Sequence, residues 1–456
     1  MEKINISKHK NFCPLPWMHL YKDTDHSVKL CCADRGEPLG DLSKNTFEEI
    51  KNNDEFIKIR KQFLNDERPE RCKDCWISED NNRHSLRTSN LHYTKTSPYY
   101  NEFANDNINY LDFRTSNLCN LGCKICMPHF SSKLAEAWDS EGLILDDGSV
   151  YRKGNKEYYT SFHKRRVKFN DIGNILSPDL SRVYFAGGEP LLSDEHWTIL
   201  DNLKEHGLTD ISLMYNTNFT LLTYKGKDLL DYVKDFKEVE LCCSLDGIGE
   251  SFDYWRTGGK WETILKNLDR VKEFRDSGYP NVILGVTSAV GWMNFKEVFK
   301  LHKFLVEEGY LLVDETASRA LQMQPVYGLG VSFEYTPPLI REEILEIFDE
   351  YEQWRDSTFD KKFGVLDNIT MLRNLVKNSE FNIYNFISWV QHNKSMDNYF
   401  GTELGDQYSF KNKEFLNIIK DIYSTKGKIN VRLTSIYESL LSDLTLSDTI
   451  RKLYII

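Results

Sequence analysis

Residues 108–130 read INYLDFRTSNLCNLGCKICMPHF, and this stretch decides the fold class. It opens with a strand-like segment, INYLDFRTS, and runs directly into three cysteines, Cys119, Cys123 and Cys126. The next segment, SSKLAEAW at 131–138, has the composition of a helix. Four thiolates would close a metal site, so three in a strand-to-helix loop indicate a metal centre with one coordination position open.

Strand-like and helix-like segments alternate along the residues that follow. Further strands are predicted at 182–192, 210–218, 239–247 and 281–290, with a sixth near 311–327. Helical patterns separate most of them, at 193–207, 225–236, 261–278 and 295–309. This alternation predicts parallel βα units, in which reactive groups lie at the carboxyl ends of the strands. The cysteine loop and the motifs GGEP, NTN and SLDG all fall at such ends.

Composition narrows the class of protein. The chain has 456 residues and a net charge of −11, which disfavours a nucleic-acid binder that works by phosphate attraction, although HKRRVK at 163–168 is a local basic patch. The start is polar and no run of eighteen apolar residues occurs, so we expect a cytoplasmic protein without a membrane span. In that compartment the ten cysteines are expected to be reduced, metal-bound or catalytic.

The cysteine spacing resembles that of a known family. CxxxCxxC after the first strand is similar to the signature of radical S-adenosylmethionine (radical SAM) enzymes. The resemblance implies that Cys119, Cys123 and Cys126 hold a [4Fe–4S] cluster whose fourth iron is chelated by SAM. It further implies reductive cleavage of SAM to methionine and a 5′-deoxyadenosyl radical, which abstracts a substrate hydrogen. Ile125 departs from the family, which often has an aromatic residue before the last cysteine.

Later motifs extend the resemblance in the family's order. GGEP resembles its glycine-rich turn after the second strand, and SLDG at 244–247 resembles its fourth-strand motif. Arg256 matches an arginine that pairs with the SAM carboxylate, and Glu189 could accept from the SAM ammonium. The implied SAM contacts are Gly187, Gly188, Glu189, Pro190, Asn218, Ser244, Asp246 and Arg256. Three plainer interpretations stay open: a simple Gly-Gly turn, a surface charge at Arg256 and a turn-forming Asn218.

The first hundred residues form a cysteine-bearing unit of their own. Residues 17–32 predict a hairpin around a polar turn, and the apolar spacing of 46–64 predicts a helix capped by Thr46. The whole segment resembles the auxiliary-cluster modules called SPASM and twitch domains, which usually follow the barrel rather than precede it. The resemblance implies a second [4Fe–4S] cluster. Its candidate ligands are Cys13, Cys31 (or Cys32), Cys72 and Cys75.

Zinc is the alternative metal at both sites. His129 follows Cys126 by three residues, so the loop could instead be a Cys₃His zinc knuckle. Four cysteines in the N-terminal module could equally form a structural Cys₄ zinc site. Spacing does not separate zinc from iron there; only the resemblance favours iron.

Two further features of the sequence carry predictions. Cys242 and Cys243 lie on the predicted fourth strand, and alternation places Cys242 on the side of Ser244, toward the barrel interior. A thiol there could donate a hydrogen atom to a substrate radical, although a small buried hydrophobe is the plainer interpretation. Residues 139–172 are polar and look like an insertion. From 340 onward the chain is mainly helical, with another possible strand at 428–436.

The sequence therefore predicts an α/β fold, a partial (βα)6 TIM-like barrel over 108–335. A Cys-rich α+β module (1–100) precedes it and a helical extension (340–456) follows. The expected function is radical SAM chemistry, with SAM and two [4Fe–4S] clusters, on a peptide or protein. The alternatives are the same chemistry on a small metabolite, or a non-catalytic iron–sulfur or zinc scaffold. The expected partners are SAM, the substrate and an electron donor such as ferredoxin or flavodoxin.

Overall fold

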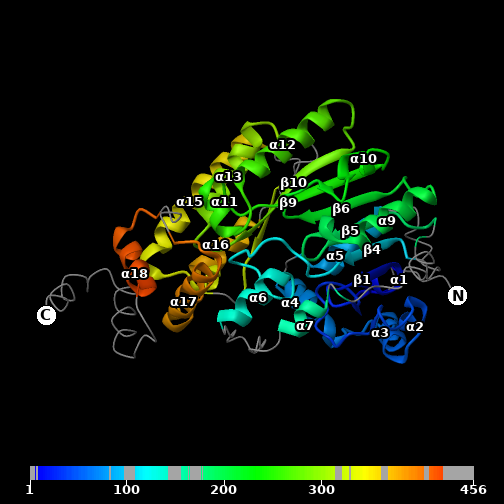
Figure 1. Ribbon diagram of the computed structural model, residues 1–456. Helices are drawn as coiled ribbons and strands as arrows, with labels where there is room; N and C mark the ends of the chain where they lie inside the picture. The colour runs from blue at the N-terminus through cyan, green and yellow to red at the C-terminus, as the bar shows by residue number, and fades with distance from the viewer. Residues whose placement is uncertain are drawn as a thin grey trace.

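The protein is described from a computed structural model (Figure 1). The description covers residues 6, 9–81, 84–96, 108–141, 156–162, 164, 176, 178–313, 321–327, 330–360, 368–404 and 410–424. The possible strand at 428–436, most of the basic patch and most of the polar insertion lie outside these residues. None of the helices in the described ranges combines the length and hydrophobicity that a membrane crossing requires.

A nine-stranded sheet organises the molecule. Its order is β11-β10-β9-β6-β5-β4-β1-β2-β3, and every pair from β11 to β1 is parallel. Six of these strands are those predicted for the barrel: β4 (Tyr110–Arg114), β5 (Arg182–Ala186), β6 (Ser212–Thr217), β9 (Glu238–Ser244), β10 (Val282–Val290) and β11 (Leu321–Pro325). The predicted α/β class with a parallel sheet is confirmed.

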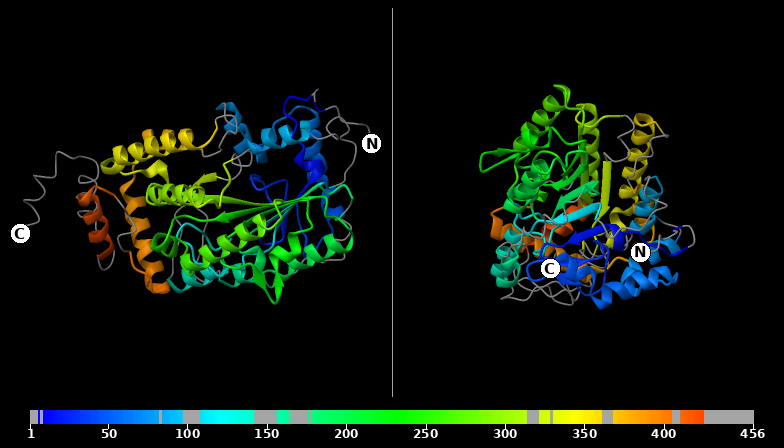
Figure 2. Two further views of the ribbon diagram at one scale, coloured as in Figure 1. Left: turned by 90° about the horizontal axis from the view of Figure 1, so that it is seen from above. Right: turned by 90° about the vertical axis from the view of Figure 1, so that its right-hand side faces the viewer.

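Helices cover one face of this sheet (Figure 2). The helices that follow the strands are α6 (Ser132–Glu141), α9 (Asp194–Glu205), α10 (Leu229–Val233), α11 (Glu250–Trp255), α12 (Trp261–Asp276) and α13 (Phe295–Glu307). Alternate strand residues such as Val183, Leu213 and Leu241 pack with Leu200 and Leu268 of the helices in one core. Period-two alternation places Asp112, Glu240 and Thr287 on the other face, although Ser288 of β10 lies on the helix-covered face. A two-stranded ribbon, β7 (Thr223–Tyr224) and β8 (Lys227–Asp228), precedes α10.

The N-terminal module is built into the same sheet, which the sequence did not predict. The expected hairpin is confirmed as β1 (His19–Lys22) and β2 (Ser27–Lys29), joined by β3 (Gly40–Asp41). β1 also pairs in parallel with β4, so the hairpin continues the barrel sheet. The pairing covers the edge of β4 that would otherwise expose unpaired backbone groups.

A buried lysine reinforces this junction. Lys22, fully buried at the end of β1, donates to the carbonyls of Arg114 (2.8 Å), the last residue of β4, and Thr115 (2.7 Å), which follows it. Its ammonium also lies 3.6 Å from the carboxylate of Glu195 on α9. One side chain therefore ties the module, the first barrel strand and a covering helix together.

The rest of the module is short helices. They are α1 (Leu15–Met18), α2 (Phe47–Lys51), α3 (Asp54–Leu64), η2 (Glu70–Cys72), α4 (Lys73–Asp80) and α5 (Leu86–Thr96). Thr46 caps α2 as predicted, in a capping box with Glu49. The single helix expected over 46–64 is two helices, because Asn53 caps α3 and starts it afresh.

The C-terminal helices extend the barrel rather than forming a separate body. They are η4 (Phe333–Tyr335), α15 (Pro338–Thr358), α16 (Ile369–Lys377), α17 (Ile383–Phe400) and α18 (Lys413–Ser424). Trp292, just past β10, packs against Phe386, Trp389 and Phe415 in a second, aromatic core. The described part of the insertion includes α7 (Lys156–Ser161), which contacts α6.

Buried histidines predict how stability depends on pH. His302 of α13 is fully buried between Ser288 of β10 and Tyr351 of α15, and burial lowers its pKa to about 3. In the unfolded chain this histidine binds a proton below about pH 6.5, whereas in the folded chain it stays neutral. The free energy of unfolding therefore falls as the pH falls below that value. Between pH 7 and 5 the loss should be about 2 kcal/mol.

Urea unfolding at pH 7 and at pH 5 would measure this loss of stability. We expect His302→Gln to lower stability at pH 7 but to show a smaller pH dependence than the wild type. An equal pH dependence in both proteins would contradict a neutral, buried His302.

Candidate functional site

The three clustered cysteines lie in the loop between β4 and α6, at the carboxyl end of the sheet. Two backbone hydrogen bonds join this loop to the carboxyl end of α11 and the residues after it: Gly122 N donates to Thr257 O (2.8 Å) and Lys124 N donates to Trp255 O (2.9 Å). A tight turn, in which Cys126 N donates to Cys123 O (3.2 Å), brings the last two cysteines close to each other. The loop is therefore shaped by its own backbone and by the residues around Arg256.

Polar donors approach two of the thiols. Asn218 Nδ2 lies 3.8 Å from Cys119 Sγ, and Arg256 Nη1 lies 3.9 Å from Cys123 Sγ. Burial raises the pKa of all three thiols, to about 12 for Cys126, while the charge of Arg256 opposes the shift at Cys123. A metal would displace these protons, because thiolates are the ligands. The donor set, three thiols with amide and guanidinium donors beside them, suits an anionic iron–sulfur cluster.

The glycine turn after β5 packs against this loop with no room for side chains. Gly188 N donates to Ser116 O (2.6 Å), and Glu189 N donates to Leu118 O (2.8 Å). A Cβ on Gly188 would lie 2.3 Å from Leu118 O, and Gly187 has a φ of +116°. Both glycines are needed for backbone reasons, as the motif indicated.

Glu189 has a structural role in this turn. Its carboxylate is fully buried and accepts from Asn218 N (2.7 Å), Thr217 Oγ1 (2.8 Å) and Leu191 N (3.2 Å). Burial raises the pKa of Glu189 to about 7, although these three donors oppose the shift. The side chain thus locks the turn to the end of β6. Pro190 follows as the first residue of η3 (Pro190–Leu192).

The remaining predicted SAM contacts gather around the same strand ends. Asp246, after β9, is fully buried, accepts from Ala289 N (2.8 Å) and lies 2.5 Å from Arg256 Nε. Ser244 ends β9 and is half-buried. Asn218 forms a turn, since its Oδ1 accepts from Thr220 N (3.0 Å). The structure therefore brings the SAM candidates to one edge of the sheet, with Arg256 already paired to Asp246.

His129 is engaged elsewhere than at the thiols. Its Nε2 lies 3.2 Å from Asp23 Oδ1 in the β1–β2 turn, and Thr24 Oγ1 donates to its carbonyl (3.0 Å). Burial alone would raise the pKa of Asp23, but the hydrogen bond and charge of His129 outweigh burial and lower it to about 2. This geometry disfavours the Cys₃His zinc knuckle and shows that the module contacts the cysteine loop.

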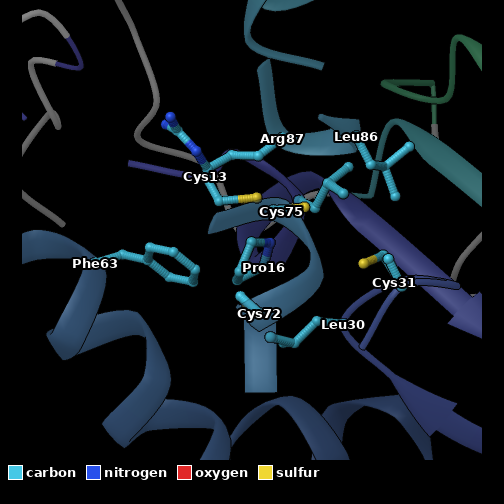
Figure 3. Close-up of a pocket in the computed structure, with 11 residues that line it drawn as sticks. Cys13, Pro16, Leu30, Cys31, Phe63, Cys72, Cys75, Leu86 and Arg87 are labelled. Carbon is cyan, nitrogen blue, oxygen red and sulfur yellow. The ribbon is translucent and has the colours of Figure 1, made fainter. Parts of the chain in front are cut away.

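Four cysteines of the N-terminal module surround one small pocket (Figure 3). Cys13 precedes α1, Cys31 follows β2, and Cys72 and Cys75 flank the start of α4. Leu15, Leu30 and Phe63 contribute apolar walls, and the buried Arg87, held by Glu79, adds a positive charge. Burial raises the pKa of Cys13 to about 12. The set offers four thiols in a largely apolar pocket, which suits a closed metal site.

The adjacent Cys32 is not part of this pocket. The strand predicted to reach Cys32 ends at Lys29, and the chain then turns so that Cys31 is buried while Cys32 is exposed. One zinc ion would need its thiolates about 3.8 Å apart. Among the described residues, no three Cys, His, Asp or Glu side chains are arranged to hold a single ion.

The two cysteine sites lie at opposite ends of the sheet. His19 Nδ1 contacts Leu30 O (3.0 Å), which places Cys31 near the start of β1. The CxxxCxxC loop instead follows the carboxyl end of β4, the strand that pairs with β1. The four paired residues span about 13 Å of strand.

Cys242 and Cys243 lie on opposite faces of β9. Cys243 belongs to the core between sheet and helices. Cys242 is buried beside the carboxylate of Glu240, with 3.4 Å between Sγ and Oε1. Burial and this carboxylate raise the pKa of Cys242, so it is a protonated thiol. Its role as a hydrogen donor stays a prediction.

Sequence reasoning missed the buried Lys124, which lies within the cysteine motif. Its ammonium binds the carboxylate of Asp397 on α17, and both side chains are almost fully buried. A charged residue between two cysteines signals the need for a counter-ion. Its partner is 273 residues away and has no sequence signal of its own.

Family models match two segments of the chain. One, described as the radical SAM superfamily, matches residues 113–289 and so covers the cysteine loop and the motifs grouped around it. This chain therefore contains a radical SAM domain at residues 113–289. A second model, SPASM, described as an iron–sulfur cluster-binding domain, matches residues 13–76. The radical SAM domain is therefore preceded by a SPASM domain, as the resemblance implied.

Curated relatives match only part of this chain. Two proteins named probable GTP 3′,8-cyclase, from Methanococcus maripaludis strains C5 and C7, are each 30% identical over 124 residues. The match covers 26% of this chain and 40% of each relative.

Solved structures are similar to about half of the chain, at low sequence identity. SuiB of Streptococcus suis bound to S-adenosylmethionine is 14% identical, with a TM-score of 0.32, and 54% of this chain and 45% of that one are covered. The protein anSMEcpe with bound AdoMet is 17% identical, with a TM-score of 0.34, and coverage is 55% and 60%.

The tight approach of the glycine turn can be tested directly. Gly188→Ala places a methyl group against the Leu118 carbonyl, so the turn or the cysteine loop must shift. We expect SAM affinity to fall at least about tenfold, or about 1.4 kcal/mol, by isothermal titration of the reconstituted protein. Gly207→Ala is the control, because a Cβ there meets no atom within 4 Å and costs only backbone strain. Unchanged affinity in Gly188→Ala would contradict this role.

Substitutions of the adjacent Cys31 and Cys32 provide a matched test and control for the auxiliary site. Cys31→Ala should lower iron content from about eight to about four per chain, because it removes a ligand of one cluster. Cys32→Ala should keep about eight, since Cys32 lies outside the pocket. Iron, sulfide and zinc analysis after anaerobic reconstitution measures both. Equal losses in the two variants would refute the assignment, and one zinc retained in the wild type would make the site structural.

Proposed function

We propose that this radical SAM protein cleaves SAM reductively and abstracts a hydrogen atom from its substrate. The observation that carries the proposal is the loop of Cys119, Cys123 and Cys126, with Arg256 beside Cys123 and the glycine turn packed against it. When bound there, a [4Fe–4S] cluster supplies the electron that splits SAM into methionine and a 5′-deoxyadenosyl radical. A scaffold protein would not need these groups at one strand edge.

The chain's own residues have distinct proposed roles. The three cysteines hold the cluster, and Arg256, oriented by Asp246, binds the SAM carboxylate. The backbone of Gly187 and Gly188 lets the methionyl part approach closely. Asn218 and Ser244 are the proposed ribose contacts, and Glu189 keeps the turn in place.

A second cluster is proposed in the SPASM domain, on Cys13, Cys31, Cys72 and Cys75. The pocket geometry of these four side chains and the family model over 13–76 support it. Because the module is hydrogen-bonded into the barrel sheet, the second cluster would keep a constant position relative to the first. We propose ferredoxin or flavodoxin as the electron donor.

The finer proposal is a peptide or protein substrate, which rests on the resemblance to SPASM-bearing enzymes. A small metabolite is the second candidate. The partial match to proteins named probable GTP 3′,8-cyclase favours it, because that name specifies a nucleotide. Incubation of the reduced protein with SAM and either GTP or short peptides encoded beside the gene would separate the two by mass spectrometry.

The core proposal predicts the fate of SAM. Reduced, reconstituted protein should form 5′-deoxyadenosine, and Cys123→Ala should abolish its formation, because a cluster ligand is lost. Cys243→Ala, which alters a thiol in the core between sheet and helices, is the control and should keep most of the wild-type rate. Liquid chromatography of the nucleoside measures both. A fully active Cys123→Ala, or a wild type that forms no 5′-deoxyadenosine, would refute the proposal.

A further inference from the structure

The C-terminal helices contact the cysteine loop through one buried carboxylate. Asp397, on α17, is 1% exposed. It binds the ammonium of Lys124 and accepts from Thr402 Oγ1 (2.5 Å). Its second oxygen accepts from Tyr423 OH (2.7 Å) and Tyr254 OH (3.3 Å).

These partners come from four separate parts of the chain. Lys124 lies in the cysteine loop, Tyr254 on α11, Thr402 just after α17 and Tyr423 on α18. Lys124 Nζ lies 5.0 Å from the centre of the Tyr254 ring. Tyr254 in turn lies two residues before Arg256 in the sequence. One carboxylate therefore holds the loop and the segment that carries Arg256 in fixed relation.

A second contact joins α17 to the same loop. Phe400 packs directly on Gly122, because a Cβ there would lie 2.3 Å from the Phe400 ring. Met396 and Phe400 also pack with Leu134, Trp138 and the partly buried Cys126. The end of α17 thus packs on the cysteine loop at Gly122 and Cys126. Figure 1 shows α17 beside α6, the helix that follows this loop.

The charge balance at this point concerns the cluster as well as the loop. Lys124 stands between Cys123 and Cys126, with its side chain fully removed from solvent. In such a setting an uncompensated ammonium would act strongly on any nearby anion, since solvent does not screen it. Asp397 supplies the opposite charge, so the cysteines experience a nearly neutral pair.

We propose that Asp397 is a positioning residue for the SAM-binding cluster, and that the C-terminal helices are part of that site. Asp397 acts through Lys124: it fixes the loop that carries the ligands and cancels the charge beside them. The inference rests on the proposed cluster at Cys119, Cys123 and Cys126.

The test is a redox titration of the reconstituted full chain, followed by electron paramagnetic resonance. The signal that changes when SAM is added reports the SAM-binding cluster, and the other signal reports the auxiliary cluster. Asp397→Asn keeps the shape and removes the charge. We expect the SAM-sensitive signal to titrate at a higher potential, because the free ammonium favours the more negative, reduced cluster, while the auxiliary signal stays unchanged.

Controls separate positioning from general stability. Tyr423→Phe removes a donor to the same carboxylate without changing charge and should leave the potential unchanged. The double variant Lys124→Gln/Asp397→Asn removes both charges and should return the potential toward the wild-type value. A general loss of stability would produce neither pattern.

The outcomes are distinct. Loss of the SAM-sensitive signal alone, with auxiliary iron retained, would also support the inference. An unchanged potential and iron content in Asp397→Asn would overturn it. If Asp397→Asn does not fold, Lys124→Gln decides: an unchanged potential and iron content overturns the inference, and a shift or loss at the SAM-binding cluster alone supports it. A wild type with no SAM-sensitive signal would instead refute the proposed function.

Discussion

The parallel pairing of β1 with β4 is the constraint on which the arrangement of this protein depends. It joins the SPASM domain to the radical SAM barrel by the same backbone hydrogen bonds that join the barrel strands to each other. Lys22 strengthens the junction from inside, through the carbonyls that follow β4. A domain that precedes the barrel in sequence is thereby incorporated into its sheet, and a flexible linker does not set its position.

This pairing explains the relation between the two cysteine sites. The auxiliary pocket lies at the amino end of β1, while the CxxxCxxC loop follows the carboxyl end of β4. Parallel register places the β1–β2 turn beside that loop, where Asp23 meets His129. The module therefore contacts both ends of the sheet, although its own cysteines are at only one of them.

Two buried ion pairs lie beside the cysteine loop. Lys124 with Asp397 and Arg256 with Asp246 are ion pairs whose desolvation costs much of what their attraction returns. Such pairs are poor sources of stability but good devices for fixing one geometry. Their position around a single loop agrees with a site in which thiols, guanidinium and backbone must be held in register.

Much of the fold was predictable because its signals are local. Strand and helix alternation, the Thr46 cap and the backbone demands of Gly187 and Gly188 depend on neighbours a few residues away. The grouping of the cysteine loop with GGEP and SLDG was also predictable, since carboxyl ends of parallel strands share one edge. The hairpin was predicted, but not its pairing with β4, because any strand edge offers the same backbone groups.

The sequence by itself determined the barrel class, the superfamily motif and the cysteines able to bind metal. The sequence also favoured Cys31 over Cys32 as the ligand, from its position after the hairpin turn, and tertiary structure places Cys31 in the pocket because the chain turns after Lys29. Tertiary structure alone decided that His129 binds Asp23 and that Lys124 binds Asp397. Both contacts join residues more than a hundred positions apart. The sequence shows that a side chain is charged, but it does not show which oppositely charged residue lies beside it after folding.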